Sequence, residues 1–215
     1  MLIDTHLHES KYSLDSFVSL SEIVAKAKAM GLDGICITDH ESNEIKTEAK
    51  KLAKEMNFII IVGAEFLTVE GDMTVFGLDK LPDKRIHTNE LVHLVDKTGG
   101  IAIASHPYRQ NNRGMGDFIR DIEKLWGVEA FNGSTPKELN QKAYELAIEL
   151  GIPTLGGSDA HNTNQVGKFA SVMPDWVKDE ASFIKAMKSK LVHPAVFENG
   201  LYTEIRNYDD STKVG

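Results

Sequence analysis

Apolar and polar residues alternate in blocks along the chain, with short apolar runs separated by longer segments of helical period. Seven runs are predicted to be β-strands: Leu2–Leu7, Gly34–Thr38, Phe58–Val62, Met73–Phe76, Ile101–Ala104, Val128–Phe131 and Thr154–Leu155. Six segments have the spacing and end residues of helices: Ser21–Met30, Ile45–Met56, Asn89–Thr98, Gly116–Trp126, Pro136–Leu150 and Glu180–Lys190. Strands that alternate with helices are typical of a parallel sheet with helical crossovers, and seven strands favour a closed barrel over an open sheet.

The chain is predicted to form one domain. Its interior contains no Ser-, Gly- or Pro-rich linker and no block of like charge. A chain of 215 residues can bury roughly 70% of the surface of its unfolded state, so a core forms without disulfides. We therefore predict a single domain over residues 1–208, followed by a polar tail over residues 209–215.

Charge and composition narrow the function classes. The chain has 24 Lys and Arg residues against 32 Asp and Glu residues, and this formal charge of −8 argues against a duplex nucleic acid partner. Cys36 is the only cysteine, so an intrachain disulfide is impossible and a reducing, cytoplasmic location is expected. The first residues lack a signal-peptide pattern, and no apolar run is long enough to span a membrane. We therefore expect a cytoplasmic protein with no membrane partner, yet one that carries eight histidines.

Polar residues of the kinds that bind metals stand where six of the seven predicted strands end. The segments are Asp4–His8, Thr38–His40, Gly63–Glu65, Ser105–Pro107, Phe131–Gly133 and Gly157–His161. In a parallel α/β barrel, the catalytic groups lie at the carboxyl ends of several strands. The sequence therefore predicts that these segments meet in one functional site.

The first and third segments have the residue types of a metal centre. Strand side chains alternate between two faces, so His6 and His8 project to the same side and can share one metal. Asp4 lies on that side too and can orient one of the two rings. The two oxygens of Glu65 can bridge two cations about 3.5–4 Å apart, as in two-metal hydrolases.

Other predicted ligands come from the loops and the later strand ends: Asp15, His40, His106, Asp159 and His161. Arg109 follows His106 closely and offers a guanidinium suited to two-point binding of phosphate or carboxylate. Taken singly, each of these residues is also consistent with a turn or a solvated loop. Their recurrence at strand ends favours the metal interpretation. The remaining histidines, His87, His93 and His193, are expected to be structural or surface residues.

Five of these segments, in this order, resemble the motifs of the PHP (polymerase and histidinol phosphatase) family over residues 1–165. They are Asp4–His8, Thr38–His40, Gly63–Glu65, Ser105–Pro107 and Gly157–His161. The resemblance implies a distorted TIM-like (β/α)7 barrel of the α/β class, with two or three divalent metals at the strand ends. It implies a first metal on His6, His8, Glu65 and Asp159, a second on Glu65 and His106, and a third on Asp15, His40 and His161.

The sequence departs from the family pattern after Glu65. Many members have a further histidine in the next strand, whereas this chain has Asp72 directly before the predicted strand Met73–Phe76. Asp72 either replaces that ligand or leaves the second metal loosely held. The short interval Glu41–Gly63 has no room for the inserted domain of some family members that hydrolyse nucleotides. The chain thus resembles a minimal, stand-alone form with an open mouth.

These features predict a metal-dependent phosphoesterase, most specifically a phosphomonoesterase that hydrolyses a small phosphorylated metabolite or nucleotide. Mixed histidine and carboxylate sites suit Zn, Mn and Fe alike, and a hydroxide that bridges the metals is the expected nucleophile. Arg109 is expected to stabilise the phosphoryl oxygens. Asp39 and His40 are candidate proton donors, although His40 cannot donate while it binds a metal.

Two alternatives remain open from the sequence. The first is an amidohydrolase-type metallohydrolase, which also begins with a His-x-His pair. Such enzymes usually bridge their metals with a carboxylated lysine, where this chain has Glu65. The second alternative is a non-catalytic metal-binding module that serves a partner protein. A protein that has lost its catalytic activity is expected to have lost some of the metal ligands as well. The ligand sets predicted for the first and third metals are complete in this chain.

Overall fold

The computed structural model describes residues 1–206, so the tail predicted at 209–215 lies outside the described residues. The helices are α1 (Leu20–Ala29), α2 (Lys46–Met56), α3 (Thr88–Lys97), α4 (Lys137–Glu149) and α5 (Glu180–Lys188). The first strands are β1 (Leu2–Leu7), β2 (Gly34–Ile37), β3 (Ile59–Val62), β4 (Ala64–Leu67), β5 (Asp72–Phe76) and β6 (Ile101–Ala104). The later ones are β7 (Gly127–Asn132), β8 (Thr154–Gly157), β9 (Phe169–Val172), β10 (His193–Glu198) and β11 (Leu201–Glu204).

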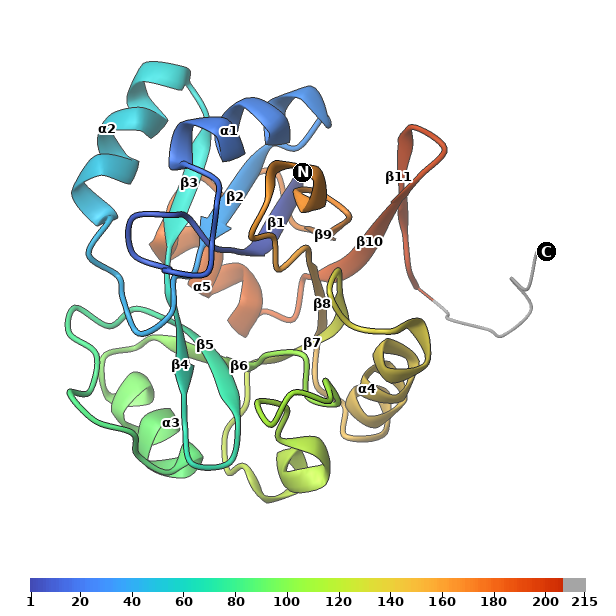
Figure 1. Ribbon diagram of the computed structural model, residues 1–215. Coiled ribbons are helices and arrows are strands. Elements are labelled where there is room, and N and C mark those ends of the chain that lie inside the picture. Colours follow the sequence, from blue (N-terminus) through green and yellow to red (C-terminus); the bar gives the residue numbers. More distant parts are fainter. Residues whose placement is uncertain (207–215) are drawn as a thin grey trace.

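The strands form two sheets that together make a distorted barrel (Figure 1). One sheet has the order β11-β10-β9-β1-β2-β3 and the other the order β4-β5-β6-β7-β8. Isolated bridges join the sheets on both sides, between His40 and Glu65 and between Leu7 and Ala160. Strand β3 continues into β4 after Gly63, so the two occupy one strand position in the barrel. The seven positions around the barrel are therefore β1, β2, β3–β4, β5, β6, β7 and β8. This is the predicted (β/α)7 arrangement.

The barrel is mostly parallel, but the prediction of a parallel sheet was wrong for β5 and did not include β9. Strand β5 runs antiparallel to both β4 and β6, and β9 runs antiparallel to β1. Only residues 68–71 connect β4 to β5, and a parallel crossover needs about a dozen residues or more. The connection therefore forces a hairpin, and it places the start of β5, rather than its end, at the carboxyl ends of the other strands.

Two other predictions of secondary structure need correction. The helix predicted at Gly116–Trp126 is a short 3₁₀ helix over Gly116–Asp121. It ends early because Trp126 N donates to Ala102 O and the chain joins the sheet at Gly127. The strands β4, β9, β10 and β11 were not predicted. The other five helices and seven strands lie within a few residues of their predicted positions.

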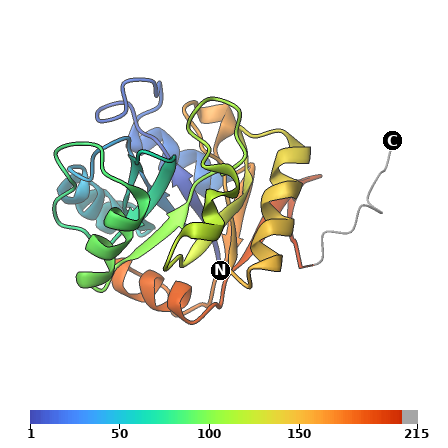
Figure 2. The same cartoon turned by 90° about the horizontal axis from the view of Figure 1, so that it is seen from below.

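Helices cover the outside of the barrel, and α5 closes the end opposite the loop that follows β1 (Figure 2). From α5, Phe183 packs against Phe76 with a centroid distance of 4.7 Å, and Met187 joins the same cluster beside Ile3 and Ile101. Burial of each such side chain stabilises the fold by about 1.5–3 kcal/mol. Among residues 1–206, no helix has the length and apolar character needed to cross a membrane.

Candidate metal centre

The predicted site residues meet at the carboxyl ends of the barrel strands. His6 and His8 come from β1 and the residue after it, His40 follows β2, Glu65 lies in β4, His106 follows β6, and Asp159 and His161 follow β8. Asp15 comes from the loop after β1, and Asp72 comes from the start of β5 because that strand runs in reverse. Every predicted metal ligand therefore reaches the same end of the barrel.

The donor atoms predicted for the first metal converge on one point. Nε2 of His6 and Nε2 of His8 lie 3.0 Å apart, and Oδ1 of Asp159 lies 3.7 Å and 3.2 Å from them. A metal about 2.0–2.2 Å from each ligand holds tetrahedral donors about 3.3–3.6 Å apart. Within residues 1–206, Asp159 Oδ1 is buried without a hydrogen-bond partner. The spacing and the unpaired carboxylate oxygen both fit a cation.

Glu65 lies between two pairs of histidines. Its Oε1 is 2.9 Å from Nε2 of His106 and 3.4 Å from Nε2 of His6. Its Oε2 is 2.9 Å from Nδ1 of His40 and 3.7 Å from Nε2 of His8. The two oxygens thus face different ligand sets, which is the geometry that a bridging carboxylate needs.

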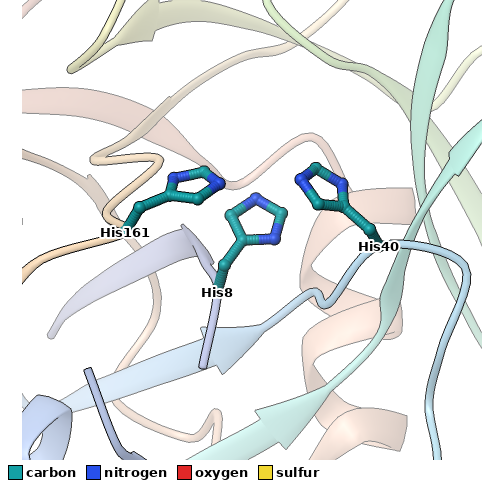
Figure 3. A group of neighbouring side chains, drawn as sticks. All are labelled: His8, His40 and His161. Atoms are coloured by element: carbon teal, nitrogen blue, oxygen red, sulfur yellow. The ribbon is translucent and has the colours of Figure 1, made fainter. Parts of the chain in front are cut away.

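The set predicted for the third metal lies toward solvent. Oδ2 of Asp15 is 3.2 Å from Nε2 of His40 and 3.4 Å from Nε2 of His161. Figure 3 shows the rings of His8, His40 and His161 side by side, and the ring of His8 is 4.2 Å and 4.4 Å from the other two. The Asp15 side chain is 60% exposed. This set therefore forms the outer part of the centre, where a ligand from solvent would enter.

The set predicted for the second metal differs, because an arginine contacts its carboxylate. Oδ2 of Asp72 is 3.8 Å from Nε2 of His106, but the same oxygen accepts a hydrogen bond of 2.6 Å from Nε of Arg113. Nη2 of Arg113 is also 3.3 Å from Nδ1 of His40 and 3.7 Å from Oε2 of Glu65. Sequence reasoning missed Arg113, because it lies in a loop with no recognisable signature.

Glu129 supports the first set from behind and was also missed. Its Oε1 is 3.0 Å from Nδ1 of His6, and its Oε2 accepts from the backbone N of His106 and from Nδ2 of Asn132. The available signal was a single carboxylate inside the otherwise uncharged strand over residues 127–132. A buried charge in a strand is rare without a partner. The sequence therefore contained enough information to predict Glu129 as a site residue.

Asp4 does not orient a histidine ring, contrary to the prediction. Its carboxylate instead accepts from the backbone N of Ser158 (2.9 Å) and of Gly167 (3.0 Å), which fixes the segment that carries Asp159. The reason is that Glu129 already occupies the place beside His6. Burial raises the pKa of Asp4 to about 6, against the effect of these hydrogen bonds.

Asp39 lies beneath the loop that carries Asp15. Its Oδ1 accepts from the backbone N of Glu9 at 2.7 Å and from the hydroxyl of Ser13 at 2.8 Å. The same hydroxyl lies 3.3 Å from Nδ1 of His8. Burial raises the pKa of Asp39 to about 7. The structure thus connects Asp39 to His8, a predicted metal ligand, through Ser13.

Arg109, which was predicted to bind phosphate, reaches the first set. Its Nη1 donates to Oδ2 of Asp159, and 22% of its side chain is exposed at the mouth. The other three histidines are remote from the centre: His87 pairs with Glu70, His93 pairs with Glu123, and His193 is exposed.

The electrostatics of the buried set call for a cation. Burial opposes ionisation of Asp159, but the charges of His6 and His106 hold the pKa of Asp159 well below its usual value. Burial lowers the pKa of His6, but Glu129, Glu65 and Asp159 outweigh it and raise that pKa well above its usual value. Burial lowers the pKa of His8 to about 4. The carboxylates of this set thus favour a positive charge beside them, which a proton on His6 supplies here and a divalent cation can supply in its place.

Comparison with known proteins identifies the family. Residues 4–102 match the model of the PHP domain, and residues 137–190 match the model described as PHP-associated. The uncharacterized protein MJ1587 of Methanocaldococcus jannaschii is 33% identical over an alignment of 167 residues. The match covers 67% of this chain and 96% of that protein.

Two solved structures share the fold. A candidate metal-dependent phosphoesterase from Bifidobacterium adolescentis has a TM-score of 0.67 at 16% identity, over 86% of this chain and 95% of that chain. The lesion-specific endonuclease PfuEndoQ from Pyrococcus furiosus has a TM-score of 0.64 at 17% identity, over 88% of this chain and 56% of that chain. The family matches, the relative and the ordered ligand motifs lead to one conclusion. The chain belongs to the PHP family of metal-dependent phosphoesterases.

Proposed function

We propose that this phosphoesterase is a phosphomonoesterase that hydrolyses a small phosphorylated metabolite or nucleotide. One observation chiefly supports the proposal: buried histidine and carboxylate donors lie 3.0–3.7 Å apart at the mouth of the barrel, with a partly exposed arginine bonded to Asp159. A terminal phosphate carries about two negative charges at pH 7. Cations and a guanidinium suit such a group, and within residues 1–206 every group of three or more possible metal ligands lies at this mouth, which Arg109 also reaches.

The ligand assignments are part of the proposal. His6, His8, Glu65 and Asp159 would hold one metal, and Asp15, His40 and His161 would hold another. His106 would contribute through Glu65, whose Oε1 it contacts at 2.9 Å. Bound Zn, Mn or Fe ions would neutralise phosphate charge and lower the pKa of a bound water to about 7.

The protein's own residues position and polarise the substrate. Glu129 accepts from Nδ1–H of His6, which leaves the lone pair of Nε2 directed into the donor set. Arg109, which Asp159 holds at the mouth, would donate to the phosphoryl oxygens, an electrostatic role that is strongest where water is excluded. Asp39 contacts Glu9 and Ser13 rather than the mouth, so we assign it to positioning and not to proton transfer.

A substrate panel tests the reaction class. The purified protein, with and without complete metal removal by chelation, is assayed with p-nitrophenyl phosphate, bis-p-nitrophenyl phosphate and nucleoside monophosphates. The proposal expects hydrolysis of the monoesters, loss of activity after chelation and recovery with Mn²⁺, Zn²⁺ or Fe²⁺. Phosphatase activity that survives complete metal removal would contradict it.

The same panel separates the alternatives. A single-stranded oligonucleotide is included because PfuEndoQ, which shares the fold, is an endonuclease by name. Cleavage of the oligonucleotide or of the bis-ester in preference to monoesters would favour a phosphodiesterase. Hydrolysis of amide substrates alone would favour an amidohydrolase. Metal binding without any turnover would favour a module that serves a partner protein.

A further inference from the structure

We propose that Arg113 takes the place of a metal at the second position, so that the chain binds two divalent cations and not three. The inference rests on the roles proposed above for Glu65 and His106, but it concerns a different feature of the chain. The guanidinium of Arg113 would supply, as a fixed part of the protein, the positive charge that a further cation supplies to Glu65 and Asp72.

The contacts of Asp72 carry the inference. Glu65, Asp72 and His106 offer ligand atoms within 4.8 Å of one another, so these residues alone could hold an ion. The oxygen of Asp72 that approaches His106, Oδ2, is however the oxygen that accepts the 2.6 Å hydrogen bond from Nε of Arg113. A cation bound to that oxygen would lie next to a positive guanidinium, and the two like charges would repel.

Arg113 also reaches Glu65 of the second set and His40 of the third set. Its Nη2 lies 3.7 Å from Oε2 of Glu65 and 3.3 Å from Nδ1 of His40. Glu65 and Asp72 are both buried, with 1% and 0% of their surface exposed. A buried carboxylate pair requires a positive partner, and the guanidinium meets this need without a metal.

The first set provides the contrast. Asp159 also has an arginine partner, Arg109, but that hydrogen bond falls on Oδ2. The other oxygen, Oδ1, faces His8 at 3.2 Å and has no hydrogen-bond partner among residues 1–206. Asp159 therefore directs its unpaired oxygen at the histidines. Asp72 also has a buried oxygen without a hydrogen-bond partner among residues 1–206, Oδ1, but its oxygen nearest His106 is Oδ2, which Arg113 occupies.

The backbone holds Arg113 in this place. The backbone N of Asp72 donates to the carbonyl of Arg113 at 2.8 Å, which joins the loop to the first residue of β5. Gly71 permits the close approach, because a Cβ at that position would lie 2.8 Å from Arg113 O and 2.7 Å from Met115 N. The guanidinium is thus attached to a fixed segment.

Metal stoichiometry tests the inference. The metal-free full-length protein is dialysed against Mn²⁺ or Zn²⁺, freed of excess metal and analysed for bound metal per chain. Arg113→Met removes the charge but keeps a long side chain. Arg120→Met is the matched control, because Arg120 pairs with Glu149 on the surface. The expected content is two ions in the wild type and in Arg120→Met, and three in Arg113→Met. Adding Asp72→Asn to Arg113→Met should return the content to two.

Three ions in the wild-type protein would overturn the inference, and so would two ions in a folded Arg113→Met variant. Circular dichroism checks that each variant is folded, and Arg113→Gln replaces Arg113→Met if the latter does not fold. The outcome is independent of the substrate, because no activity is measured. A protein that binds two ions but hydrolyses no phosphate ester would uphold this inference and contradict the proposed function. Fewer than two ions in the wild type would contradict both.

Discussion

Oε1 of Glu129 lies 3.0 Å from Nδ1 of His6, and both side chains are buried behind the first donor set. The contact fixes the tautomer of His6, because a proton on Nδ1 leaves Nε2 free to bind a metal. Glu129→Gln keeps the shape of the side chain but removes its charge, so it weakens this preference. We expect the affinity for the first metal to fall about 10- to 100-fold, as measured by competition with a chromophoric chelator.

Glu123→Gln is the matched control for that experiment. Glu123 also pairs with a histidine, His93, at 2.9 Å, but both side chains are largely exposed. Its substitution should leave the metal affinity unchanged. Equal affinities in the wild type and in Glu129→Gln would show that Glu129 does not position His6 for a metal.

His8 is expected to be required for the whole centre. It is the ligand candidate whose ring contacts His40 on one side and His161 on the other, while its Nε2 faces His6. His8→Ala should therefore lower the bound metal by at least one ion per chain and reduce phosphatase activity to that of the chelated protein. His93→Ala, a surface change of the same type, should alter neither quantity. A His8→Ala variant with normal metal content and activity would refute the ligand assignment.

Arg109 is expected to act on the substrate through its charge and its two-point geometry. Loss of one such donor to a transition state typically lowers kcat about 10²- to 10³-fold. We expect a loss of this order for Arg109→Ala, with only partial recovery in Arg109→Lys, because lysine is a point charge. Arg120→Lys, on the surface, controls for a general effect of this substitution. Unchanged steady-state kinetics in Arg109→Ala would remove Arg109 from the reaction.

The residues at the strand ends were predictable because strand geometry is regular. Alternation along β1 places His6 and His8 on one face, and parallel strands bring their carboxyl ends to one rim. The reversal of β5 was not predictable from its apolar pattern, which is the same in either direction. The reversal is caused by the short connection at residues 68–71. That connection is recognisable only if β4 is known to end at Leu67, and β4, which directly follows Gly63, was not predicted.

Residues that act through another residue left a weaker signal. Arg113 gains its role from the backbone contact between its loop and Asp72, and no local pattern encodes that contact. Asp4 lies on the predicted face of β1, but Glu129 contacts His6 in its place. Glu129 lies on β7, more than a hundred residues later in the sequence. Strands β9 to β11 extend the sheet beyond β1 as antiparallel additions, and short runs at a sheet edge carry little hydrophobic periodicity.

Metal binding is expected to stabilise the folded chain. The donors come from β1, β4 and the segments after β2, β6 and β8, so the unfolded chain cannot present them together. A metal at 100 times its dissociation constant adds about 2.7 kcal/mol per site when it binds only the folded state. Thermal unfolding followed by circular dichroism should show a higher Tm with Mn²⁺ or Zn²⁺ than with chelator. An equal Tm in both conditions would contradict binding at a preformed site.

The closing helix provides a test of stability that is separate from the metal centre. Phe183 on α5 is fully buried and packs against Phe76. Helix α5 closes the end of the barrel that lies opposite the loop after β1 (Figure 2). Phe183→Ala leaves a cavity there, so we expect the free energy of unfolding to fall by about 3–5 kcal/mol. Urea denaturation in the presence of chelator measures this change without a contribution from metal. Phe17→Ala is the matched control, because that side chain is 80% exposed and its loss should change the stability by no more than about 0.5 kcal/mol. If the two variants were equally stable, α5 would not be part of the cooperative core.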